Sequence, residues 1–128
     1  MSNITESLAT LLTVDGAMSA AVVDSSTGML LGGAGSGVDL EVAAAGNTEV
    51  VRAKLRTVKS LGLNDDIEDI LITLSSQYHV IRPLATNPEV FIYLVLDRAK
   101  SNLALSRIYA NGLLRMGGQV KLKDALKG

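Results

Sequence analysis

DLEVAAAGNTEVVRAKLRTVK, residues 39–59, determines how the rest of the chain is interpreted. The stretch contains no proline and one glycine, and Asp39 is a suitable N-cap, so we expect a helix that runs to about Ser60 and ends near Gly62. At about 100° per residue, the apolar side chains of this helix form two stripes. A sheet covers only one stripe, so the helix needs a second neighbour.

The two stripes differ in the size of their side chains. The first carries larger side chains suited to packing on a sheet, with Asn47 among them: Leu40, Ala44, Val51, Leu55 and Val58. The second lies roughly 120° away and is mostly small, which lets the backbone of another helix come close. Exposed filler is the alternative interpretation of the second stripe. Its members, the predicted dimer seam, are Ala43, Gly46, Val50, Ala53 and Thr57.

Periodicity and turn residues predict the elements on both sides of this helix. We expect helices over residues 3–13 and 97–116, and strands over residues 17–24, 29–34, 67–75, 78–85 and 90–96. The order α-β-β-α-β-β-β-α with short turns predicts an α+β three-layer sandwich around a five-stranded antiparallel sheet. Pro83 fits a strand end or a bulge. We expect one domain over residues 1–118 and a tail over residues 119–128.

The third predicted strand, within DIEDILITL (residues 66–74), has few features that would protect a sheet edge. If it lies at an edge, Ile70, Ile72 and Leu74 bring apolar side chains to an unpaired ladder. A second copy of the chain could pair with that edge and bring its own long helix alongside the first. We therefore predict a homodimer.

The composition argues against several classes of protein. Twelve basic and thirteen acidic residues give no positive field for nucleic acid, and the absence of cysteine fits a reducing compartment. No apolar run is long enough to span a bilayer, and the N-terminus does not resemble a signal peptide. We expect a cytoplasmic protein without direct membrane insertion, brought to a membrane only by a partner.

No motif in the sequence indicates catalysis, a cofactor or a metal. The glycine cluster GGAGSG, residues 32–37, matches neither the dinucleotide nor the P-loop pattern, and is interpreted as a strand-to-helix connection. His79 is the only histidine, and the acidic run NDDIED lacks the spacing of a calcium loop. Serine occurs in no Gly-x-Ser-x-Gly elbow. We expect a protein that is not an enzyme.

Four stretches carry a resemblance to a known family: VDGAMSAAVVDSSTGMLLG, VAAAGNTEVVRAK, IEDILITLSSQYHVIRPL and FIYLVLDRAKSNLALSRI. In this order and spacing, the chain resembles the Roadblock family of dynein light-chain type proteins, in its bacterial branch, over about residues 4–116. The resemblance implies a Roadblock/profilin-like fold with two terminal helices on one face of the sheet and the long helix on the other. It also implies a dimer through the third strand and the long helix.

Family members serve as non-catalytic partners of Ras-like GTPases, as assembly platforms or as dynein subunits. The resemblance therefore implies a homodimeric regulator or adaptor of a small Ras-like GTPase, with a GTPase-activating or a scaffolding role, and a sensor-kinase-type protein as a further partner. The alternative is a small-ligand sensor or an assembly platform without a GTPase. The predicted partner-binding residues mix both charges, as a docking rim does: Glu49, Arg52, Arg56 and Lys59.

Overall fold

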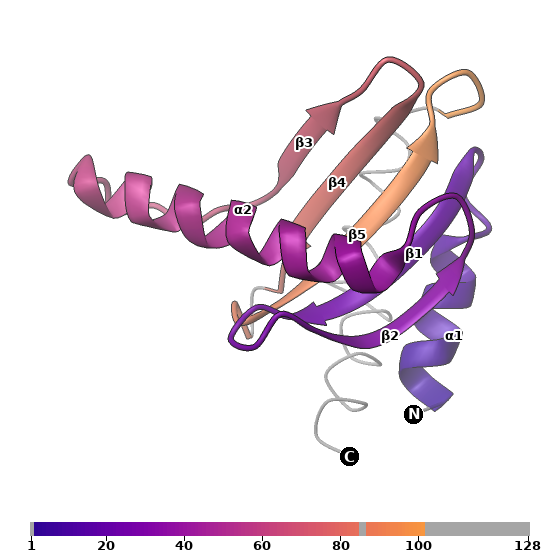
Figure 1. Cartoon of the computed structure of the whole chain (residues 1–128), viewed down its shortest axis with the longest axis horizontal. Helices are drawn as coiled ribbons and strands as arrows, with labels where there is room; N and C mark the ends of the chain where they lie inside the picture. Colours follow the sequence, from indigo (N-terminus) through magenta and orange to yellow (C-terminus); the bar gives the residue numbers. More distant parts are fainter. Residues whose placement is uncertain (1, 85–86, 102–128) are drawn as a thin grey trace.

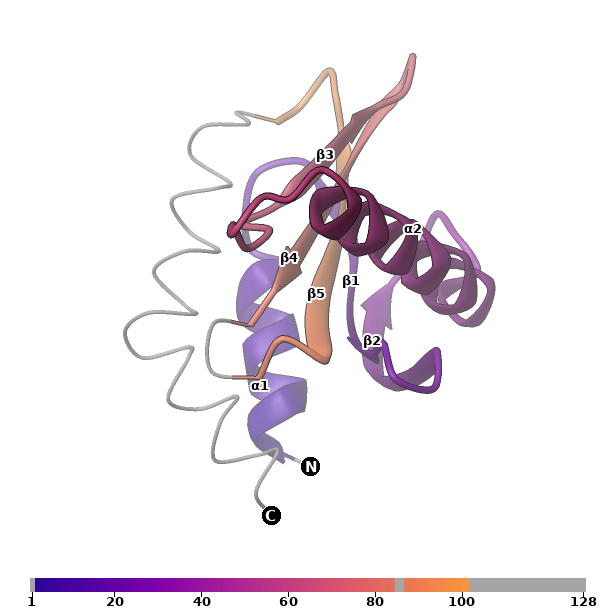
Figure 2. The ribbon, with the colours of Figure 1, turned by 90° about the vertical axis from the view of Figure 1, so that its left-hand side faces the viewer.

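The computed structural model describes residues 2–84 and 87–101 of the chain (Figure 1). They form one antiparallel sheet with the strand order β2-β1-β5-β4-β3, and Figure 2 shows a helix on each face. This confirms the predicted α+β fold and its five-stranded sheet. The elements are α1 (Ser2–Leu11), β1 (Ala17–Asp24), β2 (Met29–Gly35), α2 (Leu40–Ser60), β3 (Ile70–Thr73), β4 (Gln77–Pro83) and β5 (Val90–Asp97).

The predicted last helix, residues 97–116, lies almost entirely outside the described residues, as does the predicted tail. Its expected first residue, Asp97, instead ends β5. Pro83 is the last residue of β4, as its missing N–H requires.

β5 divides the core into two layers. It lies between β1 and β4, and every residue from Val90 to Leu96 is buried. Because side chains alternate along a strand, Ile92 and Leu94 pack with α1, while Phe91, Tyr93 and Val95 belong to the layer under α2. The continuous apolar run VFIYLVL is therefore explained by burial on both faces.

The glycine-rich edge strand β2 lets both helices approach it closely. A Cβ at Gly32 would lie 2.7 Å from Ile4 Cγ2 of α1, and one at Gly33 would lie 2.8 Å from Leu40 Cδ1 of α2. Gly32 and Gly33 thus serve helix packing within β2, and only residues 36–39 connect this strand to α2, so the predicted strand-to-helix connection over residues 32–37 begins later than expected.

Both ends of α2 are fixed by capping interactions. Asp39 Oδ1 accepts hydrogen bonds from the backbone N–H groups of Glu41 (3.1 Å) and Val42 (3.3 Å), so the predicted N-cap is confirmed. At the other end Gly62 adopts φ 72°, and its N–H donates to the Lys59 carbonyl while that of Leu63 donates to Val58. This pattern is a Schellman motif, which terminates the helix at its predicted position.

Only the first half of α2 lies on the sheet. The helix packs mainly on β1 and β2 through Ala44, Thr48 and Val51, and its second half extends past the β3 edge (Figure 1). The prediction that Leu55 packs on the sheet is wrong, because Leu55 is 45% exposed and belongs to neither core layer.

β3 forms the second edge of the sheet and is shorter than predicted. It covers only Ile70–Thr73 of the expected residues 67–75 and pairs with β4 alone. Just before the strand, Asp69 accepts a hydrogen bond of 3.1 Å from Arg82 Nη1 of β4. The acidic start of this segment therefore forms an ion pair rather than continuing the ladder.

We expect Val51→Ala and Leu55→Ala to change the free energy of unfolding by different amounts, because only the first position is packed on the sheet. Val51 is 1% exposed, so its truncation should lower the free energy of unfolding by about 2 kcal/mol through lost apolar burial. Leu55→Ala should change it by less than about 0.5 kcal/mol. Denaturant titration at low protein concentration measures both values, and equal losses would contradict the projecting second half.

Candidate functional site

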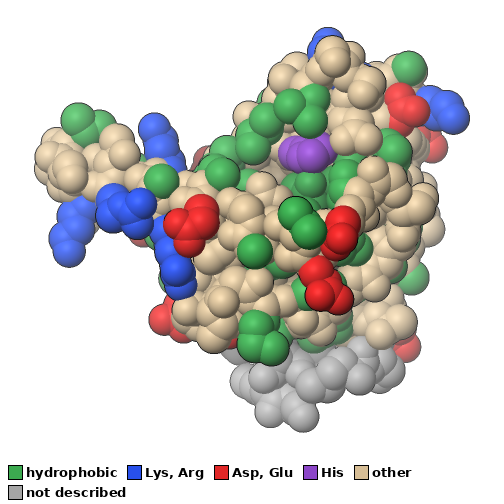
Figure 3. Space-filling model, in the orientation of Figure 1, with side chains coloured by type: hydrophobic (Ala, Val, Ile, Leu, Met, Phe, Trp, Pro, Cys, Tyr) green, Lys and Arg blue, Asp and Glu red, His purple; other side chains and the backbone are tan. Residues whose placement is uncertain are grey.

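The sheet face that carries α2 is only partly covered by it. β3 and β4 extend beyond α2 in Figure 1, and Figure 3 shows the single histidine there among apolar side chains. Ile70 and Ile72 of β3 and His79 of β4 are all half-buried at this position. We call this area the bare sheet face.

Exposed apolar side chains continue from the bare sheet face to the projecting half of α2. Several large apolar side chains that are exposed in one region usually mark a contact surface. The exposed residues of this region are Val50, Leu55, Leu61, Leu63 and, just after β3, Leu74.

The predicted dimer seam is mostly open to contact. Val50, Ala53 and Thr57 are exposed, and a Cβ added at Gly46 would meet nothing within 4 Å. Ala43 differs, because it is half-buried against the core layer under α2. At the edge, Ile70 and Ile72 pack against the same layer, and Leu74 is exposed. The seam itself stays a prediction.

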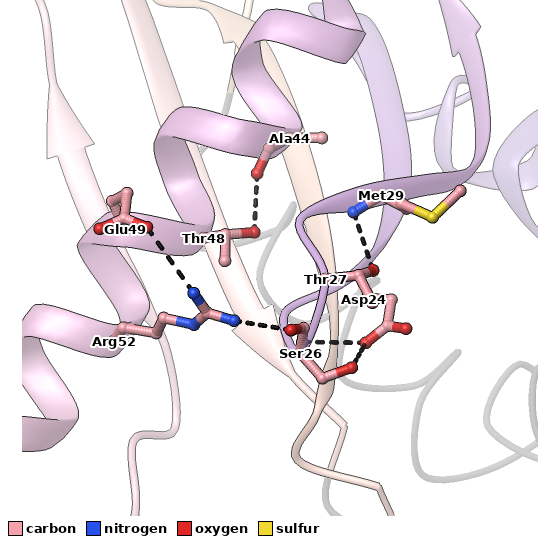
Figure 4. A network of polar contacts seen from close by, with 8 residues as sticks. All are labelled: Asp24, Ser26, Thr27, Met29, Ala44, Thr48, Glu49 and Arg52. Atoms are coloured by element: carbon pink, nitrogen blue, oxygen red, sulfur yellow. Dashed lines mark hydrogen bonds and ion pairs between the residues drawn. The ribbon is translucent and has the colours of Figure 1, made fainter.

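Arg52 is held against the body of the protein, unlike its neighbours on the same flank of α2. Its Nη2 donates to the Ser26 carbonyl at 2.7 Å, and Nη1 lies 3.8 Å from Glu49 Oε1 (Figure 4). Arg56 and Lys59 are exposed and form no ion pair with any described residue. The four predicted partner-binding residues thus lie on one helix, but Arg52 also anchors α2 to the β1–β2 turn.

The turn that Arg52 contacts is shaped by Asp24. Its Oδ1 accepts from the Ser26 hydroxyl at 2.6 Å and from the Ser26 backbone N–H at 2.9 Å. The bond from the Ser26 hydroxyl is the main reason that the pKa of Asp24 lies below its ordinary value, with backbone and Arg52 contributions in the same direction. The carboxylate therefore stays ionised and holds the Ser26 carbonyl towards Arg52.

The described residues contain no group of three or more His, Cys, Asp or Glu side chains placed to hold a metal ion. A shallow depression at the β3–β4 turn is lined by Ser75, Ser76, Asp97, Arg98 and Ala99. Arg98 is engaged there, since Nη1 donates to the Leu74 carbonyl at 2.9 Å and its guanidinium lies 5.2 Å from the Tyr78 ring centre. No helix in the described part of the chain has the length and hydrophobicity of a membrane span.

A polar row under the bare sheet face was missed by the sequence analysis. It consists of Tyr93, His79 and Gln77, which come from β5 and β4. Burial lowers the pKa of His79 and raises that of Tyr93. No local signal in the sequence indicates this row, because His79 and Tyr93 meet only where β4 pairs with β5.

Comparison with known proteins gives structural but not sequence matches. No protein-family model matches the chain, and no curated protein matches it in sequence. Myxococcus xanthus MglB superposes with a TM-score of 0.80 at 17% identity, over 98% of this chain and 89% of that one. A structure of MglB with a tetrameric arrangement gives 0.75 at 16% identity, over 86% and 81%.

A Roadblock/LC7 domain from Streptomyces avermitilis gives a TM-score of 0.69 at 14% identity, over 82% of this chain and 87% of that one. The TM-scores establish the shared fold. Sequence identities this low leave activity and partners open.

Gly46→Ala tests whether position 46 is uncovered in the single chain. Alanine is the better helix former by about 1 kcal/mol, so the free energy of unfolding should rise by about that amount. Gly35→Ala is the control and should lose stability, because φ is 94° there and a Cβ would collide with the Met18 carbonyl. Denaturant titration measures both values. If Gly46→Ala instead lowers the free energy of unfolding, and lowers it more at higher protein concentration, another chain packs against position 46.

Proposed function

From the Roadblock fold of this chain, we propose that it is a non-catalytic regulator or adaptor that pairs with a second copy and binds a small Ras-like GTPase. The GTPase class comes from the family resemblance. The observation that carries the proposal is the projecting half of α2 beside the bare sheet face. A cytoplasmic location and a sensor-kinase-type partner belong to the same proposal.

The geometry of the β3 edge supports pairing with a second copy. α2 extends past that edge, so strands added there would continue the sheet beneath its projecting half (Figure 1). The same event would cover Leu55 and the small seam residues that are exposed in the single chain, which are Gly46, Ala53 and Thr57. An MglB structure with a tetrameric arrangement indicates that this fold supports self-assembly in another protein.

The alternative, a small-ligand sensor, gains no support from the layer between α2 and the sheet. Ala44 and Val51 of α2 meet Val23 and Phe91 there, all at 1% exposure or less. Side chains fill this layer where a ligand would have to lie.

Val50→Arg and Ala53→Arg should prevent the pairing of two copies. Each would place an unpaired charge in the seam, where its burial costs several kcal/mol. Light scattering and sedimentation should show monomers for both variants and dimers for the parent chain. Lys59→Ala is the matched control on the same helix and should leave the dimer intact. Unchanged dimers in the arginine variants would remove this seam from the proposal.

The exposed flank of α2 suits a protein partner. Glu49, Arg56 and Lys59 give it both charges, as a docking rim has, without the one-sided positive charge that nucleic acid requires. Arg56 has the side chain that can extend to a bound partner, whereas Arg52 would first have to leave the Ser26 carbonyl. An arginine supplied in trans can stabilise the charge that develops during phosphoryl transfer.

Binding of the Ras-like GTPase from the same genome, loaded with GDP or with a GTP analogue, tests the partner. We expect tighter binding in the triphosphate state, measured by calorimetry. Arg56→Ala should lower affinity or stimulated hydrolysis more than Arg52→Ala, because Arg52 is engaged within its own chain. Equal affinity for both nucleotide states would leave only a scaffold. A complete lack of binding would remove the GTPase from the proposal.

A further inference from the structure

The β1–β2 turn contacts α2 at three positions along one side of the helix. A Cβ at Gly28 would lie 3.9 Å from both Ala45 Cα and Thr48 Oγ1, so the backbone of the turn packs directly against the helix. One helical turn further on, Arg52 Nη2 donates to the Ser26 carbonyl at 2.7 Å (Figure 4). The three helix positions are three and four residues apart, so they share one face.

The turn is itself bonded to the sheet, so it can hold the helix in place. Ser25 donates its backbone N–H (2.7 Å) and its hydroxyl (2.8 Å) to the carbonyl of Glu89, directly before β5. On the other side, Asp24 Oδ1 accepts from the Ser26 N–H and hydroxyl. The Ser26 carbonyl that Arg52 reaches therefore belongs to a turn that is fixed on both sides.

Within the described part of the chain, Arg52 is the last residue of α2 whose side chain bonds to another element. Residues 53–60 belong to neither core layer, and all are exposed except Val58, which is half-buried. An isolated helix is stable in water only above about 12–15 residues, and this segment is shorter. It is helical because it continues a helix that is held at Arg52.

We propose that Asp24, Ser26 and Arg52 form a clamp that fixes where the immobile part of α2 ends. While the Arg52 clamp is closed, residues 53–60 extend in one direction from the sheet. When the clamp opens, nothing bonded to the turn restrains this segment, and it frays from the Gly62 end. The clamp is thus a conformational device that controls the projecting half of α2.

The clamp also affects the proposed pairing of two copies, and this consequence rests on that proposed function. The seam residues from Ala43 to Val50 precede Arg52, whereas Ala53 and Thr57 follow it. A continuous seam needs both parts of the helix in line. Arg52 is about 200° from Val50 around the helix axis, so it acts on the seam through the direction of the helix rather than by contact.

Amide hydrogen exchange, measured by nuclear magnetic resonance at low protein concentration, tests the clamp in separate copies. Arg52→Ala should raise exchange over residues 53–60 by about tenfold, because a hydrogen bond from a charged group is lost. Residues 40–51 and the strands should keep their rates. Lys54→Ala is the matched control, since Lys54 is an exposed cation of the same helix without an ion pair to any described residue. It should behave as the parent chain.

Asp24→Ala tests the clamp from the side of the turn. Asp24 ends β1, so its removal loosens the turn without a change in the sequence of α2. Exchange should rise over the same residues 53–60. In the double variant with Arg52→Ala the two effects should not add, because each opens the same clamp.

Three results would overturn the clamp. They are a rise in exchange over the whole of α2, equal effects of Arg52→Ala and Lys54→Ala, and additive effects of Arg52→Ala and Asp24→Ala. Unchanged exchange in β1 and β5 shows that a variant keeps its fold. If Asp24→Ala loses the fold, Asp24→Asn replaces it, and its smaller loss of acceptor strength should give a smaller rise over residues 53–60.

Sedimentation separates this inference from the proposed function. Arg52→Ala and Asp24→Ala should both weaken the association of two copies, whereas Lys59→Ala should leave it intact. Normal association in both clamp variants would overturn the consequence for the seam. A parent chain that never associates removes the proposed pairing, while the exchange measurements still decide the clamp.

Discussion

The structure depends on a mismatch between the length of α2 and the width of the sheet below it. A helix of 21 residues is about 31 Å long, whereas five strands about 4.8 Å apart span about 19 Å. The Asp39 cap and the Schellman motif at Gly62 fix this length, so the helix does not end where the sheet does. The projecting half and its exposed Leu55 follow from that excess, whereas the bare sheet face lies where β3 and β4 extend beyond α2 (Figure 1).

One polar contact and one apolar layer hold α2 on the sheet. Arg52 reaches the β1–β2 turn on one flank of the helix. Ala44, Thr48 and Val51 are buried in the apolar layer. The helix up to Arg52 is therefore held by a directional bond as well as by packing, and the residues beyond it are available for other contacts.

Local patterns in the sequence were sufficient for the elements that the structure describes and for their order. The apolar run of β5, the cap at Asp39 and the glycine at position 62 each predict structure through neighbouring residues alone. The errors concern long-range contacts. Leu55 follows the helical period, but a period contains no information on where the sheet ends. Asp69, expected within the third strand, instead lies before it and pairs with Arg82. The contacts of Arg52 with Ser26 and of His79 with Tyr93 likewise join residues distant in sequence, so neither contact was predicted.

The position of β5 in the sheet determines how the chain can acquire its structure. Among the described residues β5 is the last strand, yet it is the central one and joins the β1–β2 hairpin to the β3–β4 hairpin. Before residues 90–97 emerge from the ribosome, the two hairpins have no strand to connect them, and both core layers lack the side chains of β5. Isolated hairpins are at best marginally stable in water. Folding during synthesis is therefore delayed until nearly all the described residues have been made, and the unfinished chain exposes its apolar strands until then.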